Sequence, residues 1–180
     1  MRTGHRIQWL VLLGIVATSL AIAGLYSFHF MDIPFVRVDD AWGMEASYRL
    51  ASTGVLGSPM LENGGNQTHY FHIHPPVYYL GLSLMFKWCG FGILQGKLFS
   101  LILALLALLV TCWILIETKL STPFQTFLLS ILITTTPLFF VISKTIRPES
   151  LMLLWWGLSY VLLHRWLKRK QTRYLNAGSL

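Results

Sequence analysis

Four apolar segments constrain what this chain can fold into. They are residues 7–28, 98–116, 124–142 and 151–167. The first has 22 residues and no charge, so as a helix it is about 33 Å long and matches a hydrocarbon core of roughly 30 Å. The others are also long enough to cross a bilayer, the last with basic side chains that can snorkel to the surface. An all-α membrane protein is therefore the first expectation.

The composition supports this expectation because charged residues are scarce. They make up 12% of the 180 residues, and hydrophobic residues make up 54%, whereas soluble domains carry about 25% charged residues. The net charge of +7 would suit nucleic acid, but a groove for nucleic acid needs an exposed polar surface that this composition hardly provides. We therefore expect no nucleic-acid partner.

The first apolar segment resembles both a membrane anchor and a signal peptide. It follows Arg2, His5 and Arg6, and it contains Ala21-Ile22-Ala23, which is similar to a cleavage site. The apolar core of a signal peptide has roughly 7 to 15 residues and is shorter than this segment. We expect an uncleaved anchor, with cleavage as the alternative.

A fifth apolar stretch, residues 77–86, determines the topology. Lys87 ends the stretch, and the glycines that follow it, Gly90 and Gly92, disfavour a helix. If this stretch lies along the membrane surface, three segments face the cytoplasm: 1–6, 117–123 and 164–173. These hold eight of the 14 basic residues, and cytoplasmic loops carry the excess of Lys and Arg. We predict four transmembrane helices, a cytoplasmic N-terminus and an interfacial helix near 77–88.

This topology divides the chain into four parts. They are residues 1–28, a cytoplasmic tip with the first transmembrane helix; 29–97, a large outer loop; 98–167, three transmembrane helices; and 168–180, a basic segment with the start of a further helix. Six of the seven acids then lie on the outer side: Asp32, Asp39, Asp40, Glu45, Glu62 and Glu149. The scarce carboxylates thus collect on one face of the membrane.

Two adjacent acids open a predicted helix in the outer loop. The helix runs from Asp39 and Asp40 to Gly54, and Met44 and Tyr48 have the spacing of one face. Such acids are most often caps and solvated charges. The alternative is that the acids take part in catalysis, and it rests on their position shortly after the predicted first transmembrane helix. A carboxylate there can accept a proton from an acceptor while a lipid-borne donor lies in the bilayer alongside.

Histidines precede the predicted interfacial helix. His72 and His74 stand one residue apart, shortly after His69, and no carboxylate or thiolate stands near them in the sequence. A metal site there is the less favoured interpretation, because zinc sites need further ligands. We expect a turn, with Pro75 and Pro76 fixing the start of the helix, and no metal.

The connection between the third and fourth spans contains Arg147-Pro148-Glu149. In the predicted topology it shares the outer face with Asp39 and Asp40. Arg147 or Lys97 could bind a phosphate, arginine through two parallel hydrogen bonds. The plain alternative is that Pro148 and Glu149 only begin a helix and that Arg147 has no ligand.

Taken in order, these features resemble the GT-C membrane glycosyltransferases of the protein-mannosyltransferase and aminoarabinose-transferase type, including the RgtA/B/C/D-like group. The resemblance rests on Asp39-Asp40 with Gly54, His74-Pro75-Pro76-Val77-Tyr78-Tyr79, Gly96-Lys97 and Arg147-Pro148-Glu149. It implies an inverting enzyme of the plasma membrane. Such an enzyme moves a hexose or pentose from a polyprenyl-phosphate donor to a lipid, glycan or protein acceptor on the extracytoplasmic face, without a cofactor.

The same resemblance implies a role for each matching residue. Asp39 would be the catalytic base, with Asp40 as its neighbour. Residues expected to bind substrate are Glu149, Arg147, Lys97, His74 and Tyr78. Two positions depart from the family pattern, because Asp40 stands where glutamate is common and Lys97 where arginine is common. The latter puts bidentate phosphate binding at that position in doubt.

Family members are considerably longer than this chain, and residues 174–180 resemble the beginning of another helix. We therefore expect an N-terminal portion that is inactive alone. The alternative function is that of a non-catalytic membrane subunit or transporter fragment, in which the acids are surface charges. A transporter places ionisable groups inside its spans, and the four predicted spans have essentially none away from their ends. This favours the enzyme.

Overall fold

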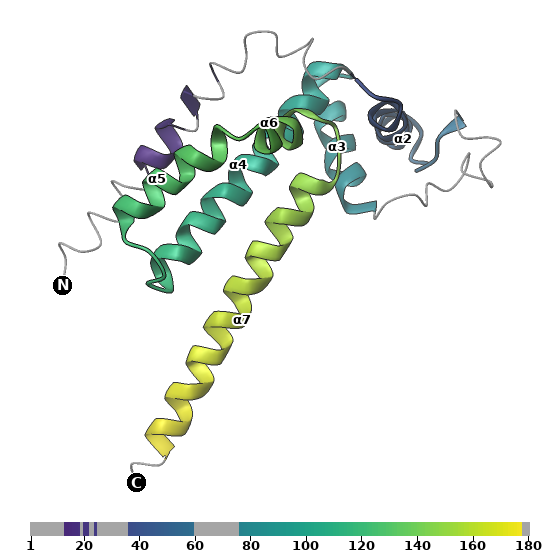
Figure 1. Ribbon diagram of the computed structural model, residues 1–180. Helices are drawn as coiled ribbons and strands as arrows, with labels where there is room; N and C mark the ends of the chain where they lie inside the picture. Colours follow the sequence, from purple (N-terminus) through teal and green to yellow (C-terminus); the bar gives the residue numbers. More distant parts are fainter. Residues whose placement is uncertain (1–12, 19, 22–23, 25–35, 60–75, 178–180) are drawn as a thin grey trace.

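The computed structural model describes residues 13–18, 20–21, 24, 36–59 and 76–177, although not the side chains after residue 170. Within these ranges there is no β-strand (Figure 1). The helices are α2 (Val38–Thr53), α3 (Pro76–Cys89), α4 (Ile93–Glu117), α5 (Pro123–Thr134), α6 (Pro137–Lys144) and α7 (Glu149–Ala177). The predicted all-α fold class is thereby confirmed for the described part of the chain.

Helix α4 is the central element of the bundle. It contacts α3, α5, α6 and α7. Helices α2 and α3 pack against each other at the end of the bundle where α7 begins (Figure 1). Residues 13–18 are helical, and the buried Ile15 packs against Leu108 and Cys112 of α4.

Three of the four predicted spans lie within the described residues. Helix α7, which contains the predicted span 151–167, is not among the described helices that are long and apolar enough to cross a membrane. Helix α4 has 25 residues and is long and apolar enough to cross a membrane by itself. Helices α5 and α6 qualify together as a second span, but with a bend of 70° between them. Most of the predicted first span lies outside the described residues. The count of four spans therefore stays a prediction.

The predicted apolar segment 124–142 is broken into two helices. Helix α5 ends at Thr134 and α6 begins at Pro137. Proline has no amide hydrogen for the preceding turn, and its ring crowds the carbonyl four residues earlier. Thr136 caps the new helix, because its Oγ1 accepts a hydrogen bond from the Phe139 amide at 3.2 Å. The apolar run is continuous in sequence, but its helix is not.

Helix α2 confirms the predicted helix that ends at Gly54. Gly54 adopts a left-handed conformation with φ of 77°, and its amide donates to the Leu50 carbonyl at 3.0 Å. The buried face includes Asp40, Gly43, Met44 and Ser47, which have the spacing of one helix face. Tyr48 is 47% exposed, although its spacing had grouped it with Met44. The buried face of α2 is therefore more polar than predicted.

Helix α3 confirms the helix predicted near 77–88, while its position at the membrane surface stays a prediction. Gly43 lets α2 approach it closely, because a Cβ atom there would lie 2.8 Å from the Tyr79 ring. The core around this contact consists of Met44, Ala46, Tyr78, Tyr79, Leu82, Phe86, Leu103 and Ile146. Each large apolar side chain buried in it contributes about 1.5 to 3 kcal/mol. This core joins α2, α3 and α4 to the connection between α6 and α7.

Helix α7 continues through the basic residues without interruption. It runs from Glu149 to Ala177, where the sequence predicted a span, a basic segment and the start of another helix. No Gly or Pro stands between residues 158 and 177, and Lys, Arg and Gln are good helix formers. The division of the chain into four parts stays a prediction.

Candidate active site

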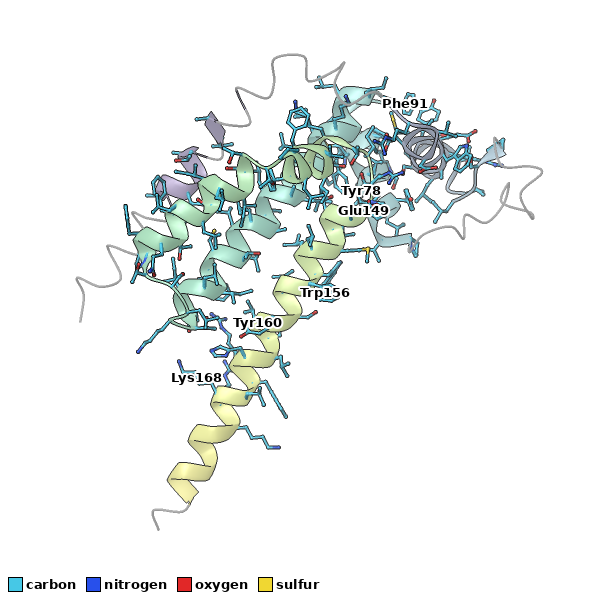
Figure 2. All side chains as sticks on the ribbon, viewed as in Figure 1. Tyr78, Phe91, Glu149, Trp156, Tyr160 and Lys168 are labelled. Carbon is cyan, nitrogen blue, oxygen red and sulfur yellow. The ribbon has the colours of Figure 1, made fainter. Side chains whose placement is uncertain are left out.

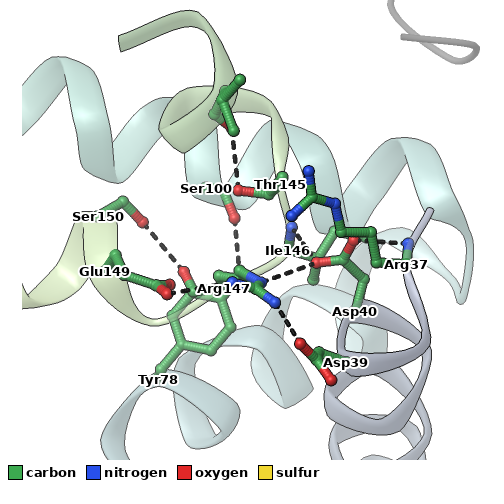
Figure 3. Close-up of polar contacts among 11 residues, drawn as sticks. Arg37, Asp39, Asp40, Tyr78, Ser100, Thr145, Ile146, Arg147, Glu149 and Ser150 are labelled. Carbon is green, nitrogen blue, oxygen red and sulfur yellow. Dashed lines mark hydrogen bonds and ion pairs between the residues drawn. The ribbon is translucent and has the colours of Figure 1, made fainter. Parts of the chain in front are cut away.

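Three acids and one arginine from distant parts of the sequence meet at the end of the bundle (Figure 3). Asp39 and Asp40 belong to the first turn of α2, Arg147 to the connection after α6, and Glu149 to the first turn of α7. The Nη2 atom of Arg147 donates to Oδ2 of Asp39. Its Nε atom lies 3.8 Å from Oδ1 of Asp40, and its Nη1 atom lies 3.6 Å from Oε1 of Glu149. The structure thus brings four of the predicted site residues together.

Asp40 is the buried member of this cluster, with 2% of its surface exposed. Its Oδ2 atom accepts a hydrogen bond from the Arg37 amide at 2.9 Å. Its Oδ1 atom accepts another from the Ile146 amide at 3.1 Å, across 106 positions of sequence. A buried carboxylate needs such donors. Asp40 therefore fastens α2 to the connection between α6 and α7.

Asp39 is the accessible carboxylate of the pair, because its side chain is 52% exposed. The neighbouring Arg147 side chain is 29% exposed. Its Nε atom is buried, as is Oε2 of Glu149, and neither atom has a hydrogen-bond partner among the described residues. A buried polar atom without a hydrogen-bond partner costs free energy of folding and is uncommon in proteins. One explanation for such an atom is a role in binding or transforming a ligand.

Two buried lysines lie next to residues that border this cluster, because Gly96 contacts Ile146 and Lys144 precedes the connection with Arg147. Lys97 lies in the first turns of α4 and Lys144 is the last residue of α6, and each is only 1% exposed. Their ammonium groups are close enough to repel each other. The Lys144 Nζ atom also lies 4.0 Å from the centre of the Phe140 ring, an attractive cation–π distance. Clustered positive charge of this kind suits a phosphate.

Gly96 allows the chain to close around Lys97. A Cβ atom at Gly96 would lie 2.7 Å from Cδ1 of Ile146, so only glycine lets residues 145–148 lie against the start of α4. Lys144 was not among the predicted site residues. The signal that could have identified it is a basic residue directly after an apolar segment, since Lys144 follows the segment 124–142.

Tyr78 has a packing role in the described structure. Its hydroxyl lies 2.7 Å from Oγ of Ser100 on α4, and its ring contacts Tyr79 and Phe99. Burial raises the pKa of Tyr78 well above its ordinary value, although the hydrogen bond with Ser100 opposes this shift. The hydroxyl is therefore neutral at physiological pH. Its predicted contact with substrate stays a prediction.

His74, the remaining predicted site residue, lies outside the described residues, as do His69 and His72. Among the residues that the structure does describe, no group of three His, Cys, Asp or Glu side chains could hold a metal ion. The expectation of a site without metal stays a prediction.

Comparison with known proteins identifies the family. The family model of the dolichyl-phosphate-mannose-protein mannosyltransferases matches residues 73–179, more than half of the chain. The chain belongs to this family. Lys97, Lys144, Arg147 and Glu149 lie inside the matched range, whereas α2 with Asp39 and Asp40 precedes it. No curated protein and no solved structure gives a significant match.

Membership confirms the resemblance drawn from the motifs. The family consists of membrane-integral glycosyltransferases of the GT-C type, so the chain is mannosyltransferase-like and a membrane protein. The apolar helix α4 agrees with this membership.

Proposed function

We propose that the cluster around Arg147 is the catalytic centre of an inverting glycosyltransferase. Its donor is a sugar on a polyprenyl phosphate, and its acceptor is a lipid, glycan or protein group on the extracytoplasmic face of the plasma membrane. One observation carries the proposal. Arg147 joins Asp39 and Asp40 of α2 to Glu149 of α7 across more than 100 positions of sequence.

Asp39 is the proposed base. The acceptor hydroxyl attacks the anomeric carbon, the bond from that carbon to the phosphate oxygen breaks, and the proton passes to the Asp39 carboxylate. The exposure of Asp39 supports this role, because an acceptor has to reach the base. Arg147 holds one Asp39 oxygen, so the carboxylate has a fixed orientation and keeps its other oxygen for the proton.

Asp40 has a different role, that of a positioning residue. Both of its oxygens accept hydrogen bonds from backbone amides and its side chain is buried. An acceptor cannot reach it without displacing those bonds. Its proposed contribution is to hold α2, and with it Asp39, at a fixed distance from Arg147.

Lys97, Lys144 and Arg147 are the proposed ligands of the donor phosphate. The phosphate gains negative charge as the sugar departs, and fixed cations stabilise that charge. An apolar hollow lined by Ile142, Met152, Leu153 and Trp156 borders Glu149. Glu149 and Trp156 lie along the same helix, α7 (Figure 2). The hollow offers a path for the first units of the prenyl chain beside the phosphate.

Exchange of Asp39 for Asn tests the proposal. In membranes that contain the full-length protein, Asp39→Asn should reduce transfer from a polyprenyl-phosphate sugar by at least about a hundredfold, because a general base contributes that much or more. Membrane insertion and thermal stability should stay unchanged, since the side chain is half exposed. Glu45→Gln is the matched control, because it removes another acid of α2 and leaves an oxygen for the bond with Ser58. Normal turnover in Asp39→Asn would place the base elsewhere.

A further inference from the structure

A second cluster of charged and aromatic side chains lies at the far end of α4. Because α4 has 25 residues, its ends are about 37 Å apart, enough to reach both head-group layers of a bilayer. Its first turns hold Lys97, and its last turns face the middle of α7 across a small hollow. Side chains that line this hollow include Trp113, Glu117, Thr118, Tyr160, His164 and Arg165. None of them belongs to the proposed catalytic centre.

Arg165 is held in place by an aromatic ring from the other helix. Its guanidinium carbon lies 4.7 Å from the centre of the Trp113 ring, within the range of a cation–π interaction. Among the described residues, no carboxylate forms an ion pair with Arg165. The guanidinium is thus oriented by Trp113 while its charge is not neutralised.

The surroundings of Arg165 add positive charge and flat aromatic surfaces. The rings of Tyr160 and His164 are stacked at 5° with centres 6.2 Å apart. One turn further along α7, exposed Lys168, Arg169 and Lys170 extend the basic surface, and Figure 2 labels Lys168. Tryptophan, tyrosine and basic side chains together are typical of the head-group layer.

We propose that Arg165, at the exposed rim of this hollow, binds the head group of an anionic phospholipid of the phosphatidylglycerol class. The hollow itself has room for about one water molecule, so the head group lies across its rim. The lipid phosphate would accept two parallel hydrogen bonds from Arg165, a geometry that guanidinium provides. Glu117 is the one acid that lines the hollow, and a head group with free hydroxyls supplies it with a donor. A phosphate head group without hydroxyls has no donor for Glu117, so the negative charge of Glu117 would repel the phosphate. This inference uses no residue of the proposed catalytic centre and does not depend on the proposed reaction.

Native mass spectrometry of the purified full chain in detergent tests this inference. Phosphatidylglycerol should bind more tightly than phosphatidylcholine, and inorganic phosphate at equal concentration should not displace it. Arg165→Gln should weaken phosphatidylglycerol binding about tenfold or more, the usual effect of losing a hydrogen bond between charged groups. Arg169→Gln is the matched control, because it removes the same charge from the same helix but does not line the hollow.

Three results would overturn the site. Equal weakening by Arg165→Gln and Arg169→Gln would mean a diffuse attraction of the basic surface. Equal binding of the two lipids would remove the role of charge, and displacement by inorganic phosphate would mean an anion site that needs no lipid. Trp113→Phe and Trp113→Leu separate this site from a general loss of structure. Phenylalanine keeps a ring beneath Arg165 and should retain most of the binding, whereas leucine should not.

Discussion

Arg147 shows how one side chain can serve both structure and chemistry. Its guanidinium approaches three carboxylates, of which Asp40 is buried and Asp39 and Glu149 are accessible. One arginine carries one positive charge, so three acids leave this group negative. Lys97 and Lys144 are buried in the first turns of α4 and at the end of α6, and they add two positive charges to this end of the bundle. In the proposed function, these charges allow the centre to accept a phosphate and to release it after the sugar has moved.

The difference between the two neighbouring aspartates gives a prediction about stability. Asp40→Ala removes two hydrogen-bond acceptors and leaves the buried Ile146 amide without a partner. This should lower the free energy of unfolding by about 2 to 3 kcal/mol, which thermal unfolding in detergent can measure. Asp39→Asn should change it little. Equal stability of the two variants would contradict the positioning role of Asp40.

Lys144 gives a prediction about donor binding. Lys144→Met keeps much of the volume of the buried side chain but removes its charge. If Lys144 binds the donor phosphate, the KM for the polyprenyl-phosphate sugar should rise about tenfold or more, the usual effect of losing a hydrogen bond to a charged group. The exposed Lys119 provides the control variant Lys119→Met. An unchanged KM in Lys144→Met would remove this lysine from the phosphate site.

Sequence reasoning identified most of the cluster but not the contacts that build it. Asp39, Asp40, Arg147 and Glu149 were predicted from their residue types and order. The bond from the Ile146 amide to Asp40 could not be predicted, because a backbone amide has no signature in the sequence and its partner is 106 positions away. The burial of Asp40 had no signature either, since acids at a helix start are usually solvated.

At the scale of single helices, the contact between α2 and α3 depends on the absence of a side chain at Gly43. Gly43→Ala would put a Cβ atom 2.8 Å from the Tyr79 ring. It should destabilise the protein by about 1 to 3 kcal/mol, as overpacking does, and lower sugar transfer because α2 carries Asp39. Unfolding and transfer assays on the same preparation measure both effects. Ser52→Ala on the exposed side of α2 should change neither, and an unaffected Gly43→Ala would mean that α2 adjusts freely.

Helix positions were more predictable than helix continuity. Gly54 predicted where α2 ends, and the two prolines at residues 75–76 predicted where α3 begins. The break between α5 and α6 was missed because apolar length alone defined the segment, although Thr134-Thr135-Thr136-Pro137 holds the signal for it. The bend matters for the site, because α6 ends at Lys144.

At the scale of the whole molecule, the predicted topology places α2 and the end of α7 on opposite sides of the membrane. A cysteine at Thr53 should react with a membrane-impermeant maleimide in intact cells, and one at Gln171 only after permeabilisation. The exposed Cys89 has to be replaced by Ser beforehand, and this background variant is the control. Labelling of both positions from the same side would contradict the four-span topology.

The bond between Asp40 and the Ile146 amide also has a consequence for the synthesis of the protein. Its two partners are separated by 106 positions, and ribosomes add roughly 5 to 20 residues per second. Once α2 has emerged, its acid therefore waits on the order of 5 to 20 seconds for the donor that holds it. Until α6 has been inserted and the connection after it has turned back, Asp40 lacks one of its two amide donors. If Asp39 is the base, as proposed, sugar transfer during synthesis has to wait until the bundle is complete as far as α7.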